Sequence, residues 1–197
     1  IRGPEGFVSV RASAVEGLLA CTGEDPAELL RGALQEDPDL RDALLHRLDR
    51  MVSNDILREL VESLSNLVPP VQVTLIRAVA RRRLHGAEEA LSAAVENSHE
   101  AVHTAAMEAL GRAGDASTVP LLVSHLDRQV ARWSLVRLRG DGVNKAIIDA
   151  LEDATPSAQR HLIQVLVERS AASAVPSLVR LAEDGKKRTR MAALRAL

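Results

Sequence analysis

The sequence predicts an all-α fold, an α-solenoid built of antiparallel helix pairs, and three observations lead to this fold class. Apolar residues recur at helical spacing, the helical pattern itself repeats about every 30 residues, and aromatic residues are nearly absent. Phe7 and Trp133 are the only aromatic residues in a chain of 197. Sheets depend on aromatic and β-branched side chains, whereas the abundant Ala, Leu, Arg and Glu are strong helix formers.

The first helix of each pair is marked by a stripe of mostly apolar residues at offsets of −8, −4 and 0 from an anchor. These offsets fall on one face of an α-helix. The stripes span residues 10–18, 40–48, 71–79, 102–110, 130–138, 158–166 and 189–197. The corresponding anchors are Leu18, Leu48, Val79, Leu110, Leu138, Leu166 and Leu197.

The second helix of each pair lies between two anchors. Its stripe is centred in turn on Leu30, Leu60, Leu91, Leu122, Ile148 and Leu178. A further apolar residue follows one turn later. In the fifth pair Glu152 stands at that place, so we expect Leu151 to supply the apolar side chain. Residues 1–197 therefore form, in this interpretation, a single solenoid of six helix pairs and the first helix of a seventh.

Proline and the chain ends mark boundaries. Pro38, Pro69 and Pro156 fall between pairs, and Pro120 and Pro176 fall early in second helices, where a missing N–H is tolerated. The chain opens without methionine and closes in a helical pattern that has no stop signal. We expect it to be an excerpt of a longer protein.

Composition excludes several classes of function. Lys and Arg number 25 against 27 Asp and Glu, so the chain lacks the basic excess of a nucleic-acid binder. No apolar run approaches the roughly 20 residues of a transmembrane helix. Cys21 is the one cysteine, so no disulfide can form within the chain. That usage fits a reducing compartment, and we expect a cytoplasmic protein.

Several segments resemble the HEAT-repeat family, in its bacterial phycobilisome-lyase-like subtype. The segments are Glu36-Asp37-Pro38-Asp39-Leu40-Arg41, Ala101-Val102-His103, Ala109-Leu110-Gly111, Val119-Pro120-Leu121-Leu122 and Ala174-Val175-Pro176-Ser177-Leu178. The family's arginine in the first helix stands at Arg11, Arg41 and Arg190. The resemblance implies a right-handed superhelix in which second helices line the concave face. It also implies a module that binds a protein partner there, without a catalytic pocket or cofactor.

Other functions stay open beside this scaffold hypothesis. Residues 155–160 are similar to HEAT segments fused to nucleotide-transporter-like membrane proteins, which would make the chain an accessory or regulatory part of a larger protein. A relative of bilin lyases would hold a chromophore or its acceptor protein. A nucleic-acid binder is the least favoured alternative. The partner and the oligomeric state are not predictable from the residues.

One string resembles a catalytic metal motif. His99-Glu100-Ala101-Val102-His103 has the H-E-x-x-H spacing in which two histidines bind zinc and the glutamate is the general base. Val102, however, is an ordinary core position, and His103 takes the place of the family arginine. No third ligand follows, although catalytic zinc needs three protein ligands. We therefore expect no metal site, no cofactor and no enzyme activity.

Two basic clusters and Trp133 also have ordinary explanations. Arg81-Arg82-Arg83 ends a first helix, where cations favour the helix dipole. Lys186-Lys187-Arg188 lies at a junction and is expected to be solvated. Trp133 precedes the stripe residue Ser134, so we expect a partly buried flank rather than a ligand anchor.

The expected partner surface follows from projecting each second helix with its stripe inward. Ser124, Glu62, Ala93 and Arg180 then point outward at equivalent places. The candidate partner-binding residues are Glu28, Arg31, Arg58, Glu62, Glu88, Ser124, Lys145, Asp149 and Arg180. Their charges alternate in sign, and such a surface sets register and association rate more than affinity.

Overall fold

The computed structural model describes residues 10–17, 25–36, 38–45, 47–48 and 52–197. The stripe residue Leu18 and the cysteine Cys21 lie outside the described residues. Throughout the described ranges the regular elements are α-helices and short 3₁₀ turns, without a strand. The all-α prediction is therefore confirmed.

The helices alternate as the two stripe series predict. Residues 10–17 are helical, and the later first helices are α3 (Pro38–Leu45), α6 (Pro69–Arg82), α8 (Glu100–Ala113), α10 (Gln129–Arg137), α12 (Pro156–Glu168) and α14 (Lys187–Ala196). The second helices are α2 (Pro26–Glu36), α5 (Asn54–Glu62), α7 (Glu88–Val95), α9 (Val119–Ser124), α11 (Val143–Asp153) and α13 (Val175–Asp184). The 3₁₀ turns are η1 (Leu64–Asn66), η2 (Ala116–Thr118) and η3 (Ala172–Ala174).

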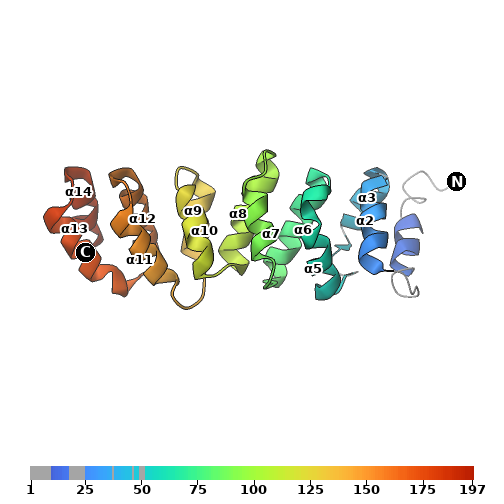
Figure 1. The fold of residues 1–197 in the computed structure, drawn as a ribbon, viewed down its shortest axis with the longest axis horizontal. Helices are drawn as coiled ribbons and strands as arrows, with labels where there is room; N and C mark the ends of the chain where they lie inside the picture. Colours follow the sequence, from blue (N-terminus) through green and yellow to red (C-terminus); the bar gives the residue numbers. More distant parts are fainter. Residues whose placement is uncertain (1–9, 18–24, 37, 46, 49–51) are drawn as a thin grey trace. The chain divides into compact units, whose positions relative to one another are not determined.

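The chain divides into two compact units, residues 1–105 and 106–197. In the first unit α2 packs on α3 and α5, and α6 packs on α3 and α5. In the second unit first helices pack on first helices, α10 on α12 and α12 on α14, while α9 packs on α11 (Figure 1). Each unit thus repeats one neighbour pattern, in which a helix pair buries its stripe against the next pair, as in a solenoid.

The stripe residues form the core. Leu30, Leu60, Leu91 and Leu122 are fully buried. The fifth pair departs from prediction by one residue, because Ile147 is fully buried and Ile148 only partly. Val143, Ile147 and Leu151 are spaced four apart on α11 and all are fully buried, so Leu151 takes the place that we expected.

The two ends of the repeat series depart from the stripe as well. Val10 exposes 55% of its surface and Leu197 exposes 58%, although the equivalent residues of the pairs between them are mostly buried. Ala14 is exposed too. Between the two ends of the series, a neighbouring helix pair covers the equivalent positions. The exposure of Val10, Ala14 and Leu197 therefore depends on how helix pairs stack and not on the helices themselves.

Helix starts are set by proline and by capping side chains. Pro38, Pro69 and Pro156 each occupy the first helical position, and Pro120 and Pro176 the second. The Thr155 hydroxyl accepts a hydrogen bond from the Ala158 N–H at the start of α12. Asp115 likewise caps η2, with Oδ1 2.8 Å from the Ser117 nitrogen. These caps satisfy amide donors that the helix cannot pair.

A polar side chain near the start of most first helices clasps the end of the preceding second helix. Arg41 Nε donates to the Leu34 carbonyl at 2.6 Å, and Gln72 Nε2 donates to the Leu64 carbonyl at 2.9 Å. The same contact is made by His103 Nδ1 to Val95 O, by Arg132 to Leu126 O at 2.5 Å and by Gln159 to Leu151 O at 3.4 Å. Glutamine and histidine thus replace the family arginine as a donor to a carbonyl that the helix leaves unpaired.

The clasp in the fifth pair differs from the sequence register. The sequence has Ala131 at the place of the family arginine, seven residues before the anchor Leu138, whereas Arg132, one residue later, makes the contact. Alanine has no donor, and the long arginine side chain reaches the same carbonyl from the next position. The hydrogen bond to the carbonyl is therefore preserved, although the residue at the aligned position is not an arginine.

Replacing Gln72 by leucine should lower the free energy of unfolding by about 1–3 kcal/mol, the cost of leaving buried polar groups unpaired. The Gln72 side chain is 4% exposed and donates to the carbonyls of both Leu64 and Leu67. Urea unfolding measures the change. The matched control is Gln164→Leu on the exposed face of α12, which should change stability by less than about 0.5 kcal/mol; equal effects would show that the clasp does not stabilise the fold.

Candidate functional site

The candidate residues of the first unit lie on α2, α5 and α7. Glu28, Arg58 and Glu62 are exposed, as is Ala93, while Arg31 and Glu88 are half-buried. The larger side chains are held locally. Arg31 Nε donates to the Ser63 hydroxyl at 3.1 Å, Arg58 pairs with Asp55 at 2.6 Å, and Glu88 accepts the Gly86 N–H at 2.8 Å. Part of the charge on this surface is therefore neutralised within the unit.

Glu59 on α5 interacts with the candidate residue Arg31 and with the carboxylate of Asp25. Burial raises the pKa of Glu59 above its ordinary value, and a hydrogen bond and repulsion from Asp25 raise it further. Arg31 opposes this shift and lowers the pKa of Glu59. The half-buried Arg31 therefore acts on Glu59 through its charge and is held by the Ser63 hydroxyl.

The candidates of the second unit lie on α9, α11 and α13. Ser124, Lys145, Asp149 and Arg180 are all exposed. Lys145 and Asp149 form an ion pair at 2.6 Å one turn apart on α11, which raises the pKa of Lys145. The Ser124 hydroxyl donates to the Leu121 carbonyl at 2.7 Å. Each of these side chains points away from the core as the helix projection predicts.

Arg180 bridges from α13 to α11. Its guanidinium pairs with Glu152, and the Ser177 hydroxyl donates to the same carboxylate oxygen at 3.1 Å. Arg180 also donates to the Ser177 hydroxyl at 3.1 Å. Glu152, which the stripe series places at a core position, thus stands at the surface and accepts two donors from the next second helix.

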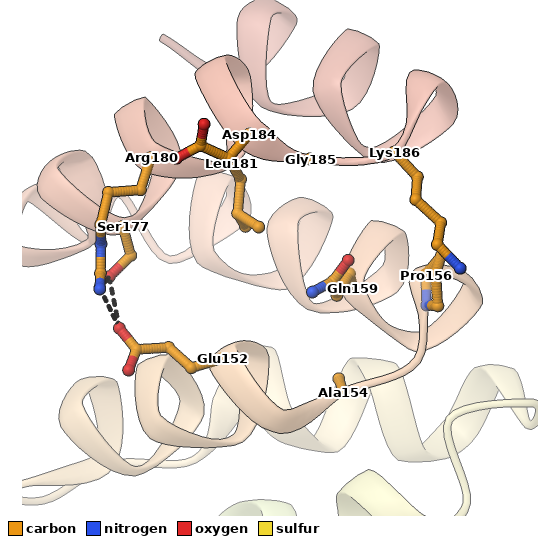
Figure 2. A pocket seen from close by; sticks show the side chains of 10 residues that line it. All are labelled: Glu152, Ala154, Pro156, Gln159, Ser177, Arg180, Leu181, Asp184, Gly185 and Lys186. Atoms are coloured by element: carbon orange, nitrogen blue, oxygen red, sulfur yellow. Dashed lines mark hydrogen bonds and ion pairs between the residues drawn. The ribbon is translucent and has the colours of Figure 1, made fainter.

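A hollow of about 460 Å³ opens beside this bridge (Figure 2). Its lining residues come from the end of α11, from along α13, and from the starts of α12 and α14. They are Glu152, Ala154, Pro156, Gln159, Ser177, Arg180, Leu181, Asp184, Gly185 and Lys186. The bridge closes one end, Leu181 and Gln159 lie in the middle, and Lys186 reaches over Pro156 at the other end (Figure 2).

A smaller hollow, of about 120 Å³, occupies the equivalent place in the first unit between α5 and α7. Glu62, Gln72, Ala93 and Asn97 are among its lining residues. By repeat position Gln72 corresponds to Gln159, Ala93 to Arg180 and Asn97 to Asp184. Both hollows therefore lie between successive second helices, beside the glutamine that clasps the preceding helix, and each includes one of the candidate partner-binding residues.

The glutamines of the two hollows have different partners. In the first unit Asn97 Nδ2 donates to Gln72 Oε1 at 3.3 Å. In the second unit the equivalent oxygen of Gln159 accepts from Thr189 on α14 at 3.2 Å instead. Gln72 is therefore bonded to another residue that lines its hollow, whereas Gln159 is bonded to the next first helix.

Comparison with protein families identifies the repeat. The family model for HEAT repeats matches residues 57–138 and 144–197, which is more than half of the chain. The chain belongs to the HEAT-repeat family. A comparison with curated proteins gave no match.

HEAT repeats explain the H-E-x-x-H string as part of a helix start. Val102 is fully buried and His103 is 7% exposed, whereas His99 and Glu100 are exposed. His103 Nδ1 bonds the Val95 carbonyl, and because a carbonyl oxygen only accepts, the ring nitrogen is the donor. In the part of the chain that the structure describes, no three His, Cys, Asp or Glu side chains are grouped as metal ligands would be.

The arginines at the end of α6 differ in their contacts. Arg82 donates to the Val52 carbonyl at 2.9 Å and to the Asn54 side chain at 3.2 Å, so it ties α6 to the preceding HEAT repeat. Arg83 is the left-handed C-cap of the helix. Arg82 therefore contacts the preceding repeat in addition to standing at a helix end that favours cations, which is all that the sequence predicted.

Arg169 makes the equivalent contact at the end of α12, and the sequence analysis missed it. It donates to the carbonyls of Leu135 at 2.6 Å and Leu138 at 2.7 Å and to Asn144 Oδ1 at 2.7 Å. Burial lowers its pKa, and Arg139 lowers it further. Arg82 and Arg169 both stand three residues after an anchor, and this shared spacing is the signal that could have revealed them.

Trp133 lines a separate hollow of about 140 Å³ on the first helices α10 and α12. The side chain is 51% exposed, in agreement with a partly buried flank. His161 from α12 lines the same hollow, and burial, followed by repulsion from Arg132 and Arg160, lowers its pKa.

None of the helices in the described part of the chain combines the length and the apolar character that a membrane span requires.

Proposed function

We propose that this HEAT-repeat chain is a non-catalytic scaffold that binds a protein partner along its second helices. The observation that carries the proposal is the repeated hollow between second helices, which includes Glu62 in one unit and Arg180 in the other. A surface that combines exposed charges with recurrent hollows suits a partner that contacts several repeats at once.

The finer assignments are proposals of the same kind. The motif segments support the bacterial phycobilisome-lyase-like subtype, and the single cysteine supports a cytoplasmic location. The near balance of charges favours a protein partner over nucleic acid. The scaffold could equally be one segment of a larger protein, and its role there would still be partner binding.

Reversing the charge at Arg58 and Arg180 should weaken partner binding at least about tenfold while leaving the thermal midpoint nearly unchanged, because both side chains are exposed and exposed ion pairs contribute little to stability. The partner is first captured from native extract with the full chain and identified by mass spectrometry. Its affinity for the purified variants Arg58→Glu and Arg180→Glu is then measured by calorimetry.

The matched controls are Arg77→Glu on α6 and Arg137→Glu on α10, which are exposed arginines of first helices. Arg47 is unsuitable as a control because it pairs with Glu16 at 3.2 Å and bonds the Ser13 hydroxyl at 3.1 Å. Loss of binding in the control variants, with full affinity in Arg58→Glu and Arg180→Glu, would place the partner on the first helices and contradict the proposal.

A further inference from the structure

Lys186 stands at one end of the larger hollow, and three more cations follow it on α14 outside the lining. Lys186, Lys187, Arg188 and Arg190 are all exposed, and no carboxylate of the described residues pairs with any of them. The first turn of α14 contains no acidic residue. Cations are unfavourable beside the positive end of a helix dipole, so an anion bound at Lys186 would also be favoured by the start of α14.

The opposite end of the hollow is electrostatically satisfied. Glu152 accepts from both Arg180 and Ser177, so the charges of Glu152 and Arg180 largely offset each other at this end. Asp184 lines the hollow too, but its carboxylate is turned away from Gln159 and Pro156, whereas the Lys186 chain extends over Pro156 (Figure 2). The two ends of the hollow therefore differ: the bridge occupies one, and a lysine without an ion pair to the described residues stands at the other.

Apart from Gln159, the lining between the bridge and Lys186 is apolar. Ala154, Pro156, Leu181 and Gly185 supply this part of the lining, and Leu181 points into it (Figure 2). The volume of about 460 Å³ lies within the range of pockets that take small ligands or short peptide segments. An apolar floor beside a cationic end fits a segment that carries an apolar side chain next to a carboxylate.

We infer that this hollow anchors an acidic peptide segment of the protein partner, with an apolar side chain over Leu181 and Pro156 and a carboxylate at Lys186. The inference rests on the proposed scaffold function and names the chemistry of the partner at one place. A peptide is favoured over nucleic acid because the lining contains no aromatic side chain on which a base could stack, and its apolar part suits an apolar side chain.

The test begins with a selection from a random peptide display library against the full chain. The enriched peptides should carry Asp or Glu next to a large apolar residue. The leading peptide is synthesised with a fluorescein label, and its affinity is measured by anisotropy. The substitution Lys186→Glu should weaken binding at least about tenfold and Lys186→Arg should preserve it, because the interaction depends on the charge at that position. The control Arg137→Glu should bind as the unmodified chain does.

Three results would overturn the inference. One is a selection that enriches basic or uncharged peptides, or none. A second is an acidic peptide that binds Lys186→Glu as tightly as the unmodified chain. A third is a single-stranded oligonucleotide of mixed sequence that binds more tightly than the peptide and loses affinity in Lys186→Glu, which would assign the cations to nucleic acid.

The partner captured from extract separates this inference from the proposed function. If Arg58→Glu weakens the binding of that partner and Lys186→Glu does not, the scaffold function stands and the inference that the hollow anchors an acidic segment of the partner is wrong. If the partner is indifferent to both substitutions and the selected peptide still requires Lys186, the hollow binds acidic peptides but the proposed partner surface is wrong.

Discussion

Replacing Leu122 by alanine should lower the free energy of unfolding by about 2–5 kcal/mol, the usual range for a buried leucine. Leu122 is fully buried in α9, a short helix of six residues that packs on α10 and α11. So short a helix has little stability of its own and depends on its packed side chains. The loss should appear as a lower midpoint in urea with little change in slope.

The control for this prediction is Val179→Ala on α13. Val179 also belongs to a second helix, but 39% of its surface is exposed, so its truncation should cost less than about 1 kcal/mol. If Leu122→Ala left the midpoint unchanged, the assignment of Leu122 to the core face of its helix would be wrong.

Replacing Gly111 by alanine should destabilise the chain by about 1–3 kcal/mol, the typical cost of overpacking. A Cβ atom at Gly111 would lie 2.6 Å from the Ser134 Cα and 2.7 Å from its Cβ. The first of these is a backbone atom, so α8 and α10 would have to move apart. The substitution Gly111→Val adds two further carbon atoms and should cost more.

Gly32 provides the matched comparison with the opposite sign. It lies inside α2, and a Cβ atom there would meet no other heavy atom within 4 Å. Alanine is favoured over glycine inside a helix by about 0.5–1 kcal/mol, so Gly32→Ala should stabilise the chain. Thermal and urea unfolding of the two variants measure both signs, and stabilisation by Gly111→Ala would show that the helices are not in close contact.

The sequence alone was sufficient for the helices and most of their buried faces. A stripe such as Val71, Leu75 and Val79 places side chains on one face of a helix whatever its neighbours are, and all three are fully buried. The prolines at helix starts and the Asp115 cap were predictable for the same reason, since they act through bonds to their own backbone.

The fifth pair shows where local pattern becomes ambiguous. Ile147 and Ile148 are both apolar and adjacent, so the sequence allows either to face the core. The structure buries Ile147 because it aligns with Val143 and Leu151 on α11. The spacing of four residues from Val143 and Leu151 favours Ile147, whereas the repeat register favours Ile148, and the packing of α11 on its neighbours decides between them.

The sequence by itself determined the all-α fold, the order of first and second helices, and the outward position of side chains such as Ser124 and Arg180, because each of these depends on residues within one helix. Only the tertiary structure decided the contacts of Arg82 and Arg169, the bridge from Arg180 to Glu152, and the two hollows. These features join side chains that are 25 or more residues apart. Their geometry is set by the spacing between stacked helices, which depends on how side chains of different repeats pack together.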